Sequence, residues 1–142
     1  MNSLPNGGRM PSVSRVVLDA SALLMHVQEE PGWEKVECQL HGSMMSTVNY
    51  SEVLKKVIER GGQAAAATAL VQRSRIELAN FDAEQGHLAA ELWPMGKSLG
   101  LSFADRACLA LGIAVSGTIL TADGRLAEAD VPVKIVLVRK GH

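Results

Sequence analysis

The stretch LSFADRACLALG, residues 101–112, combines a helix start with a run of small and apolar residues. Ser102 is a preferred N-cap residue, and Asp105 follows it at the spacing of an acidic capping box. The residues after Arg106 predict a helix over residues 102–114 that is buried in the core. This stretch therefore predicts a core helix whose first turn carries an acid and a base.

Short apolar runs alternate with helical segments along the rest of the chain. Strands are expected in RVVLDAS (15–21), SMMST (43–47), IELANF (76–81), GTILTAD (117–123) and VKIVLV (133–138). Near-continuous apolar strands that alternate with helices are typical of a parallel sheet covered on both faces. The sequence therefore predicts an α/β sandwich.

Two of the expected helices have well-marked ends. One is expected to begin with Thr47 as its N-cap and to bury a stripe of apolar residues made of Val53, Leu54, Val57 and Ile58. The other is expected to begin at Asp82 and to run to Leu99, with a kink at Pro94.

Composition and charge narrow the classes of protein. The 142 residues fit one domain, expected over residues 15–142 after a flexible tail at 1–14. The net charge of −1 gives no general polyanion-binding signature, and the two cysteines lie in no metal-ligand spacing. No apolar run approaches the roughly 20 residues of a membrane span, and no targeting segment is recognised, so a cytoplasmic protein without membrane contact is expected.

Four acidic residues are expected near one edge of the sheet. Asp19 and Asp123 end predicted strands, Asp105 opens a helix, and Glu52 lies within a helix from which it reaches the same place. Loops that follow parallel strands meet at the carboxyl edge of a sheet, where binding sites form. Oxygen ligands without His or Cys suit Mg²⁺ or Mn²⁺, because such hard ions relieve the repulsion between clustered carboxylates.

Each acid also has an ordinary structural explanation. Asp19 fits a helix cap, and Asp105 fits the capping box. Glu52 has Lys56 four residues on, a helical ion pair worth about 0.3–0.5 kcal/mol. Asp123 begins an Asp-Gly turn. These roles do not explain why three of the four acids share one kind of topological position.

Four motifs together resemble the PIN domain, and in particular the VapC-type toxins of type II toxin–antitoxin pairs. They are VLDASALL (17–24), NYSEVLKK (49–56), LSFADRACLALG (101–112) and ILTADGRL (119–126). The resemblance extends over about residues 15–138, almost the whole chain. It implies a three-layer α/β/α sandwich with a central parallel sheet of about five strands.

The resemblance also implies a function, a metal-dependent endoribonuclease that cleaves single-stranded or loop RNA by metal-activated water. The implied catalytic and metal-binding residues, for Mg²⁺ or Mn²⁺, are Asp19, Glu52, Asp105 and Asp123. Supporting roles are expected for Ser21, Thr121 and Arg106, the last of which would pair with a neighbouring acid or touch phosphate. The implied partners are a cognate antitoxin that inhibits the enzyme and a second copy in a homodimer.

Nearby basic residues extend the expected site. Lys55, Lys56 and Arg125 lie close to the motifs and are candidates for contact with RNA phosphates, although a solvated charged face explains each equally well.

Three other classes of protein share part of this pattern. A dehalogenase-like phosphatase needs a second Asp where Ser21 stands, and a receiver domain needs an acidic pair and a Lys after its last strand, whereas Lys134 begins that strand. Both are excluded by these residues. A non-catalytic PIN-like module that binds RNA or protein is the remaining alternative, and metal-dependent cleavage of RNA separates it from the nuclease.

Overall fold

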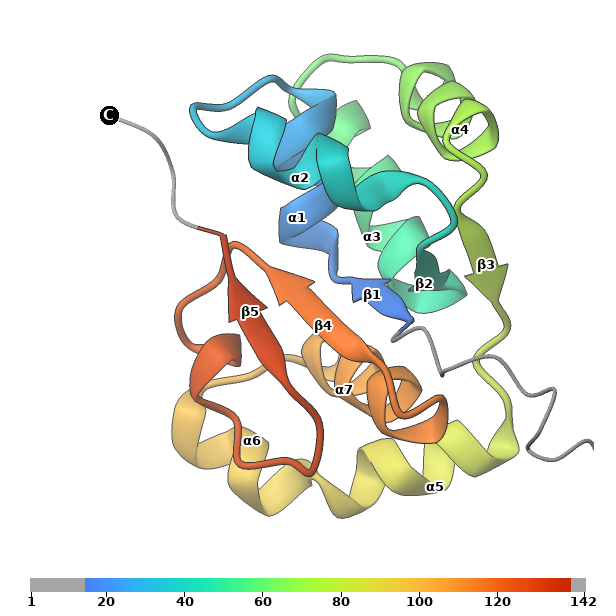
Figure 1. Ribbon diagram of the computed structural model, residues 1–142. Helices are drawn as coiled ribbons and strands as arrows, with labels where there is room; N and C mark the ends of the chain where they lie inside the picture. Colours follow the sequence, from blue (N-terminus) through green and yellow to red (C-terminus); the bar gives the residue numbers. More distant parts are fainter. Residues whose placement is uncertain (1–14, 139–142) are drawn as a thin grey trace, which may run out of the picture.

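A five-stranded, all-parallel sheet forms the centre of the protein (Figure 1). The computed structural model describes residues 15–138. In chain order the strands are β1 (Val16–Leu18), β2 (Met44–Ser46), β3 (Glu77–Ala79), β4 (Thr118–Thr121) and β5 (Ile135–Leu137). They are arranged in the order β3-β2-β1-β4-β5, which confirms the predicted α/β fold. The tail expected at residues 1–14 lies outside the described residues.

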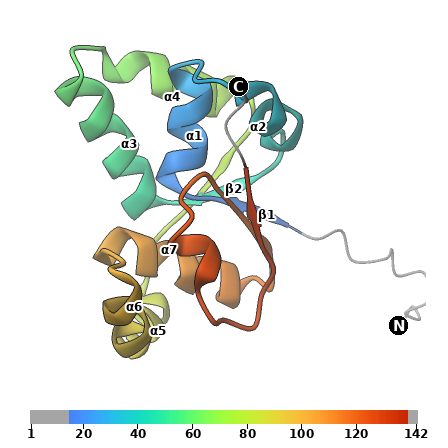
Figure 2. The ribbon, with the colours of Figure 1, turned by 90° about the vertical axis from the view of Figure 1, so that its left-hand side faces the viewer.

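Within the described residues, seven α-helices cover the two faces of this sheet. They are α1 (Ala20–Val27), α2 (Trp33–Leu40), α3 (Thr47–Glu59), α4 (Ala64–Arg73), α5 (Ala83–Glu91), α6 (Trp93–Leu99) and α7 (Phe103–Ala114). Figure 2 shows α1 to α4 on one side and α5 to α7 on the other, which is the expected three-layer sandwich. Within residues 15–138, none of the helices has the length and apolar character that crossing a membrane requires.

Successive strand residues point into two separate cores. In β1, Val17 packs in the core that contains Leu109 of α7, while Leu18 packs with Leu23 of α1. This alternation follows from the two-residue period of a strand. Because both faces are buried, both positions are apolar, which is why the strands read as continuous hydrophobic runs.

The start of α3 differs by one residue from the prediction. Ser46 is the N-cap, because its Oγ accepts a hydrogen bond from the backbone N–H of Val48 at 3.1 Å. Thr47 is instead the first helical residue, and its Oγ1 accepts from the backbone N–H of Phe81. β2 therefore runs directly into α3 without a connecting loop.

The apolar stripe of α3 is also shorter than expected. Val53 and Val57 are buried, but Ile58 is 60% exposed. Ile58 follows Val57 by one residue, which turns it about 100° around the helix axis and away from the core.

The helix expected over residues 82–99 is two helices. Asp82 caps α5 as predicted, since its Oδ1 accepts from the backbone N–H of Gln85 at 2.9 Å. α5 ends at Glu91, and α6 begins at Trp93 with Pro94 in its first turn. Proline lacks the N–H that would continue the α5 ladder, so the chain breaks and restarts at Leu92 rather than bending.

Gly112 allows α7 to lie directly against β4. A Cβ atom added to Gly112 would come within 2.6 Å of Ile119 Cδ1 and 2.7 Å of its Cγ1. We expect Gly112→Ala to lower the free energy of unfolding by about 1–3 kcal/mol through overpacking. The measurement is urea denaturation.

Gly86, within α5, provides the matched control. A Cβ added there would meet the Phe81 ring at an ordinary contact distance of 3.7 Å. Gly86→Ala should therefore leave stability unchanged or raise it by up to about 1 kcal/mol through helix propensity. Equal effects of the two substitutions would contradict the close approach at Gly112.

Candidate active site

Asp19 is the most buried of the four predicted site acids. It directly follows β1, is only 3% exposed, and caps α1 through a hydrogen bond from the backbone N–H of Ala22 to Oδ1 at 2.8 Å. Its carboxylate also accepts the hydroxyls of Ser21, at 2.8 and 2.9 Å, and of Thr121. Ser21 Oγ in turn accepts from the backbone N–H of Ala122 at 2.9 Å. This network joins the ends of β1 and β4.

Burial makes the charged form of Asp19 unfavourable. It raises the pKa of Asp19 from 3.8 to about 6, against the hydrogen bonds from Thr121, Ala22 and Ser21, which lower it. The negative charge of Asp105 adds to the increase. The carboxyl end of β1 therefore holds an acid that a nearby cation would stabilise in its ionised form.

The first turn of α7 contains the predicted capping box. Ser102 Oγ accepts from the backbone N–H of Asp105 at 3.1 Å, and Asp105 Oδ2 accepts from the backbone N–H of Ser102 at 2.9 Å. The capping box holds Asp105 at the helix start, where the positive end of the helix dipole favours a carboxylate.

The buried thiol of Cys108 is influenced by three of the four predicted acids. Burial raises the pKa of the Cys108 thiol well above its usual value, and the charges of Asp19, Asp105 and Glu52 raise it further. Cys108 is fully buried in α7, one turn after Asp105. The three acids come from three different elements of the fold, and the charge of each of them acts on this one thiol.

Glu52 lies on α3 in the predicted ion pair with Lys56, with Lys56 Nζ 3.5 Å from Glu52 Oε2. One turn earlier, the buried Asn49 donates from Nδ2 to the backbone carbonyl of Ala104 at 3.0 Å. Asn49 thus joins α3 to the start of α7, a structural role that sequence reasoning did not assign. Its position three residues before Glu52, on the same helix face, is the signal that would have identified it.

Asp123 follows β4 by two residues and lies in the predicted turn. Its Oδ1 accepts from the backbone N–H of Arg125 at 2.9 Å, and its Oδ2 lies 3.6 Å from Nη2 of the same arginine. Thr121 Oγ1 accepts from the backbone N–H of Asp123 at 2.9 Å. Thr121 therefore contacts both Asp19 and Asp123 and sets their relative positions.

Arg106 has different partners from those expected. Its Nη1 donates to the backbone carbonyl of Ala89 in α5 at 2.7 Å, and its guanidinium lies 5.7 Å from the centre of the Phe103 ring. Among residues 15–138, Arg106 forms no ion pair with a neighbouring acid. The hydrogen bond to Ala89 fastens α7 to α5, whereas Phe103 lies in α7 itself.

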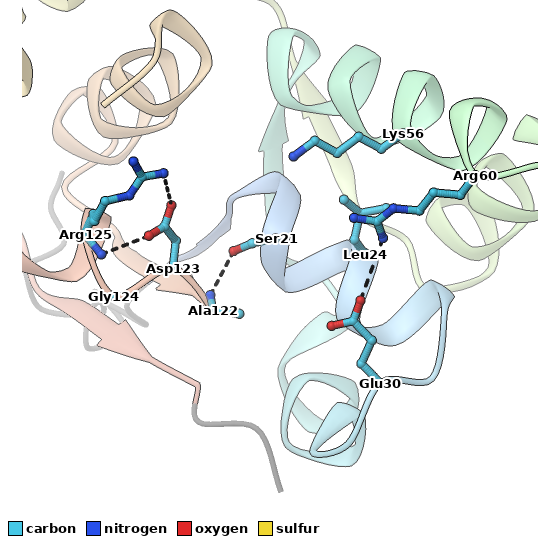
Figure 3. Close-up of a pocket in the computed structure, with 9 residues that line it drawn as sticks. All are labelled: Ser21, Leu24, Glu30, Lys56, Arg60, Ala122, Asp123, Gly124 and Arg125. Atoms are coloured by element: carbon cyan, nitrogen blue, oxygen red, sulfur yellow. Dashed lines mark hydrogen bonds and ion pairs between the residues drawn. The ribbon is translucent and has the colours of Figure 1, made fainter. Parts of the chain in front are cut away.

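The basic residues beside the site separate into two groups. Lys55 forms an ion pair with Glu59 at 2.9 Å and does not line the cavity beside the site. Lys56 and Arg125 do line it, together with Arg60, which was not identified from the sequence (Figure 3). The repeated spacing of four residues from Glu52 to Lys56 to Arg60 is a signal that could have identified Arg60.

The chemistry of these side chains fits a hard divalent cation. In the part of the chain that the structure describes, no three His, Cys, Asp or Glu side chains are grouped closely enough to hold a metal ion as they stand. Glu52 and Asp123 are held instead by Lys56 and Arg125. The four acids supply only oxygen donors, and the most buried of them is unfavourable as an anion, so they fit Mg²⁺ or Mn²⁺ rather than zinc.

The protein is an all-parallel α/β sandwich with acidic side chains at the carboxyl edge of its sheet. This combination of fold and side chains indicates the family to which it belongs. A model of the PIN domain matches residues 16–132, and the chain belongs to this family. No curated protein sequence matches the chain.

Solved structures of VapC toxins have the same fold. The chain is 16% identical to the VapC20 toxin of Mycobacterium tuberculosis, with a TM-score of 0.67 and coverage of 79% of this chain and 92% of that one. It is 14% identical to a chain of a toxin–antitoxin complex from Klebsiella pneumoniae, with a TM-score of 0.69 and coverage of 88% and 98%. It is 15% identical to a chain of DNA-bound VapBC from Salmonella typhimurium, with a TM-score of 0.67 and coverage of 87% of this chain and 98% of that one.

The raised pKa of Asp19 predicts a specific pH dependence of stability. The folded state binds the Asp19 proton more tightly than the unfolded state, so wild-type stability decreases as pH rises from about 4 to about 6. Asparagine retains a capping oxygen and cannot ionise. Relative to wild type, we expect Asp19→Asn to gain up to about 3 kcal/mol across this window.

Thermal unfolding in EDTA between pH 4 and pH 8 measures this effect. The difference in Tm between Asp19→Asn and wild type should rise through the window and then level off. A difference that is constant over the whole range would contradict a costly buried charge at Asp19.

Proposed function

We propose that the protein is a Mg²⁺- or Mn²⁺-dependent endoribonuclease that cleaves single-stranded or loop RNA. The observation that carries this proposal is the buried carboxylate of Asp19, placed beside the charge of Asp105 at the carboxyl edge of the sheet. Membership of the PIN-domain family supports it. The similar fold of VapC20, described as a toxin that cleaves the sarcin–ricin loop, agrees with it.

The ion would be held by Asp19, Glu52, Asp105 and Asp123. When bound, it supplies an activated water and stabilises negative charge on the phosphate. The protein contributes orientation. Ser21 and Thr121 donate to Asp19 and favour its ionised form, as the direction of their effect on its pKa shows.

Two helices hold two more of the proposed site carboxylates, Asp105 and Glu52, in position. The capping box fixes Asp105 against the start of α7, and Asn49 ties that start to α3, which carries Glu52. Movement of either helix would therefore be transmitted to the other. Such preorganisation lowers the cost of assembling the site around a substrate.

Substitution of Asp105 tests the nuclease assignment. Asp105→Asn keeps the shape and the capping oxygen but removes a charged ligand. We expect cleavage of total RNA in Mn²⁺ to fall by at least about 100-fold, in line with the loss of a preorganised electrostatic group, while the Tm stays close to that of wild type.

Asp82→Asn is the matched control, because Asp82 also caps a helix but belongs to α5. The Asp82→Asn variant should cleave RNA at the wild-type rate. EDTA should abolish cleavage by this variant and by the wild-type protein. Near-normal cleavage by folded Asp105→Asn would contradict the assignment. Absence of metal-dependent cleavage by the wild-type protein would favour the non-catalytic module instead.

A cognate antitoxin is the second part of the proposal. One protein of similar fold was solved in a toxin–antitoxin complex from Klebsiella pneumoniae, and another, VapBC-5 from Mycobacterium tuberculosis, is described as a member of the VapBC family of toxin–antitoxin systems. An antitoxin Arg or Lys inserted among the four site carboxylates would neutralise them by charge-assisted hydrogen bonds. A homodimer is expected on the same family grounds.

Co-expression tests the antitoxin. The protein expressed alone should arrest growth, and co-expression with the neighbouring small open reading frame should restore growth and abolish RNA cleavage. Asp105→Asn expressed alone serves as the control and should be harmless. If the wild-type protein is harmless alone and co-purifies with no partner, the toxin assignment is wrong.

A further inference from the structure

A polar cavity of about 380 Å³ opens beside the proposed active site (Figure 3). It lies between α1, α3 and the turn after β4, and it shares Ser21 and Asp123 with the site. Because the cavity and the site have these two residues in common, an extended molecule bound at the site would also contact the lining of the cavity.

The cavity carries more basic than acidic side chains. Its bases are Lys56, Arg60 and Arg125, and its acids are Glu30 and Asp123. Each acid lies within ion-pair distance of one of these bases, Glu30 of Arg60 at 3.8 Å and Asp123 of Arg125 at 3.6 Å. The lining therefore has a net positive charge immediately next to a cluster of carboxylates.

Arg60 is held in position from outside the helix that bears it. It caps the carboxyl end of α3, and its Nη1 donates to Oε1 of Gln28 in the segment between α1 and α2. The same guanidinium is 3.8 Å from Glu30. Two contacts from a separate segment thus fix where this charge lies, and Figure 3 shows its side chain reaching toward Leu24 on the cavity wall.

Lys56 and Arg125 lie between the active-site acids and the cavity. Each forms a long ion pair with a site carboxylate, at 3.5 Å for Lys56 with Glu52 and 3.6 Å for Arg125 with Asp123. Both bases also line the cavity. A long, partly exposed pair contributes little stability, so either base can contact an anion in the cavity at small cost.

We propose that this cavity binds a backbone phosphate of the RNA strand, one that neighbours the phosphate to be cleaved. This inference rests on the proposed function. Three basic side chains around one cavity suit a phosphodiester. Among the residues of 15–138 that line the cavity, Leu24 has the only large apolar side chain, and none has an aromatic ring on which a base would stack. The cavity therefore contributes affinity and position, not sequence preference.

The test is the salt dependence of RNA binding. A fluorescein-labelled oligouridylate of ten nucleotides is titrated with protein in CaCl₂ over a range of NaCl concentrations, with gel confirmation that the RNA stays intact. Loss of one phosphate contact lowers the slope of log K against log salt by about 0.7. We expect this decrease for Arg60→Ala and for Lys56→Ala, and recovery of the wild-type slope in Arg60→Lys.

Lys55→Ala is the matched control. Lys55 is adjacent to Lys56 on α3 but pairs with Glu59 outside the cavity lining, and its side chain is 65% exposed. The Lys55→Ala substitution removes one positive charge from the same helix but none from the cavity lining. The salt slope of this variant should therefore equal that of wild type. Thermal unfolding of every variant confirms that it is folded.

An uncharged backbone separates phosphate recognition from other binding. On a methylphosphonate decamer, wild type and Arg60→Ala should bind equally. An equal decrease in slope for Lys55→Ala, no decrease for Arg60→Ala, or no binding of the decaribonucleotide by wild type would overturn the proposal. So would a result in which Arg60→Ala weakens only the complex with a co-expressed antitoxin, which would make the cavity a protein-docking site.

These readouts are independent of catalysis. If RNA is bound with the expected slopes but is never cleaved in Mn²⁺, the nuclease assignment fails and the phosphate site stands. If RNA is cleaved but the slopes of Arg60→Ala and wild type agree, the phosphate site fails alone.

Discussion

The buried carboxylate of Asp19 is the constraint on which the site depends. A charge without solvent is tolerated there only because Ser21, Thr121 and the start of α1 direct hydrogen bonds to it. Those same bonds join the ends of β1 and β4, so the two central strands and the site are held by one network. The ionised form of Asp19 is the form that binds a cation, but burial of that charge costs stability. Stability and cation binding therefore compete at Asp19.

Sequence reasoning placed the strand-end acids correctly because parallel topology brings loops to a common edge. Asp19 and Asp123 each come shortly after a strand, which can be read from the order of residues along the chain, and the structure makes those two strands, β1 and β4, neighbours in the sheet. The boundary at Ser46 and Thr47 was not predictable in the same way, because two adjacent hydroxyl residues both suit a cap. The absence of a loop after β2 decides between them. Arg60 was missed because its fixed position depends on a segment distant in sequence.

Arg106 shows where adjacency in sequence misleads. It follows Asp105 directly, and this suggested a shared environment. Successive residues of a helix point about 100° apart, so the side chain of Arg106 diverges from that of Asp105 and reaches α5. Its contacts with Ala89 and Phe103 are the result. The catalytic or binding role of each candidate residue stays a prediction, whereas the fold and family membership are established.

The direct passage from β2 into α3 has a consequence for the substrate. Ser46 is both the last residue of the strand and the cap of the helix, so no hinge separates the sheet from Glu52. Asn49 also joins α3 to the start of α7 by a hydrogen bond, so β2, α3 and α7 are connected without an intervening loop or gap at this point. Under the proposed function, adaptation during binding then falls to the RNA. A flexible strand or an open loop can follow the contour of the protein, whereas a stiff duplex would have to be distorted first.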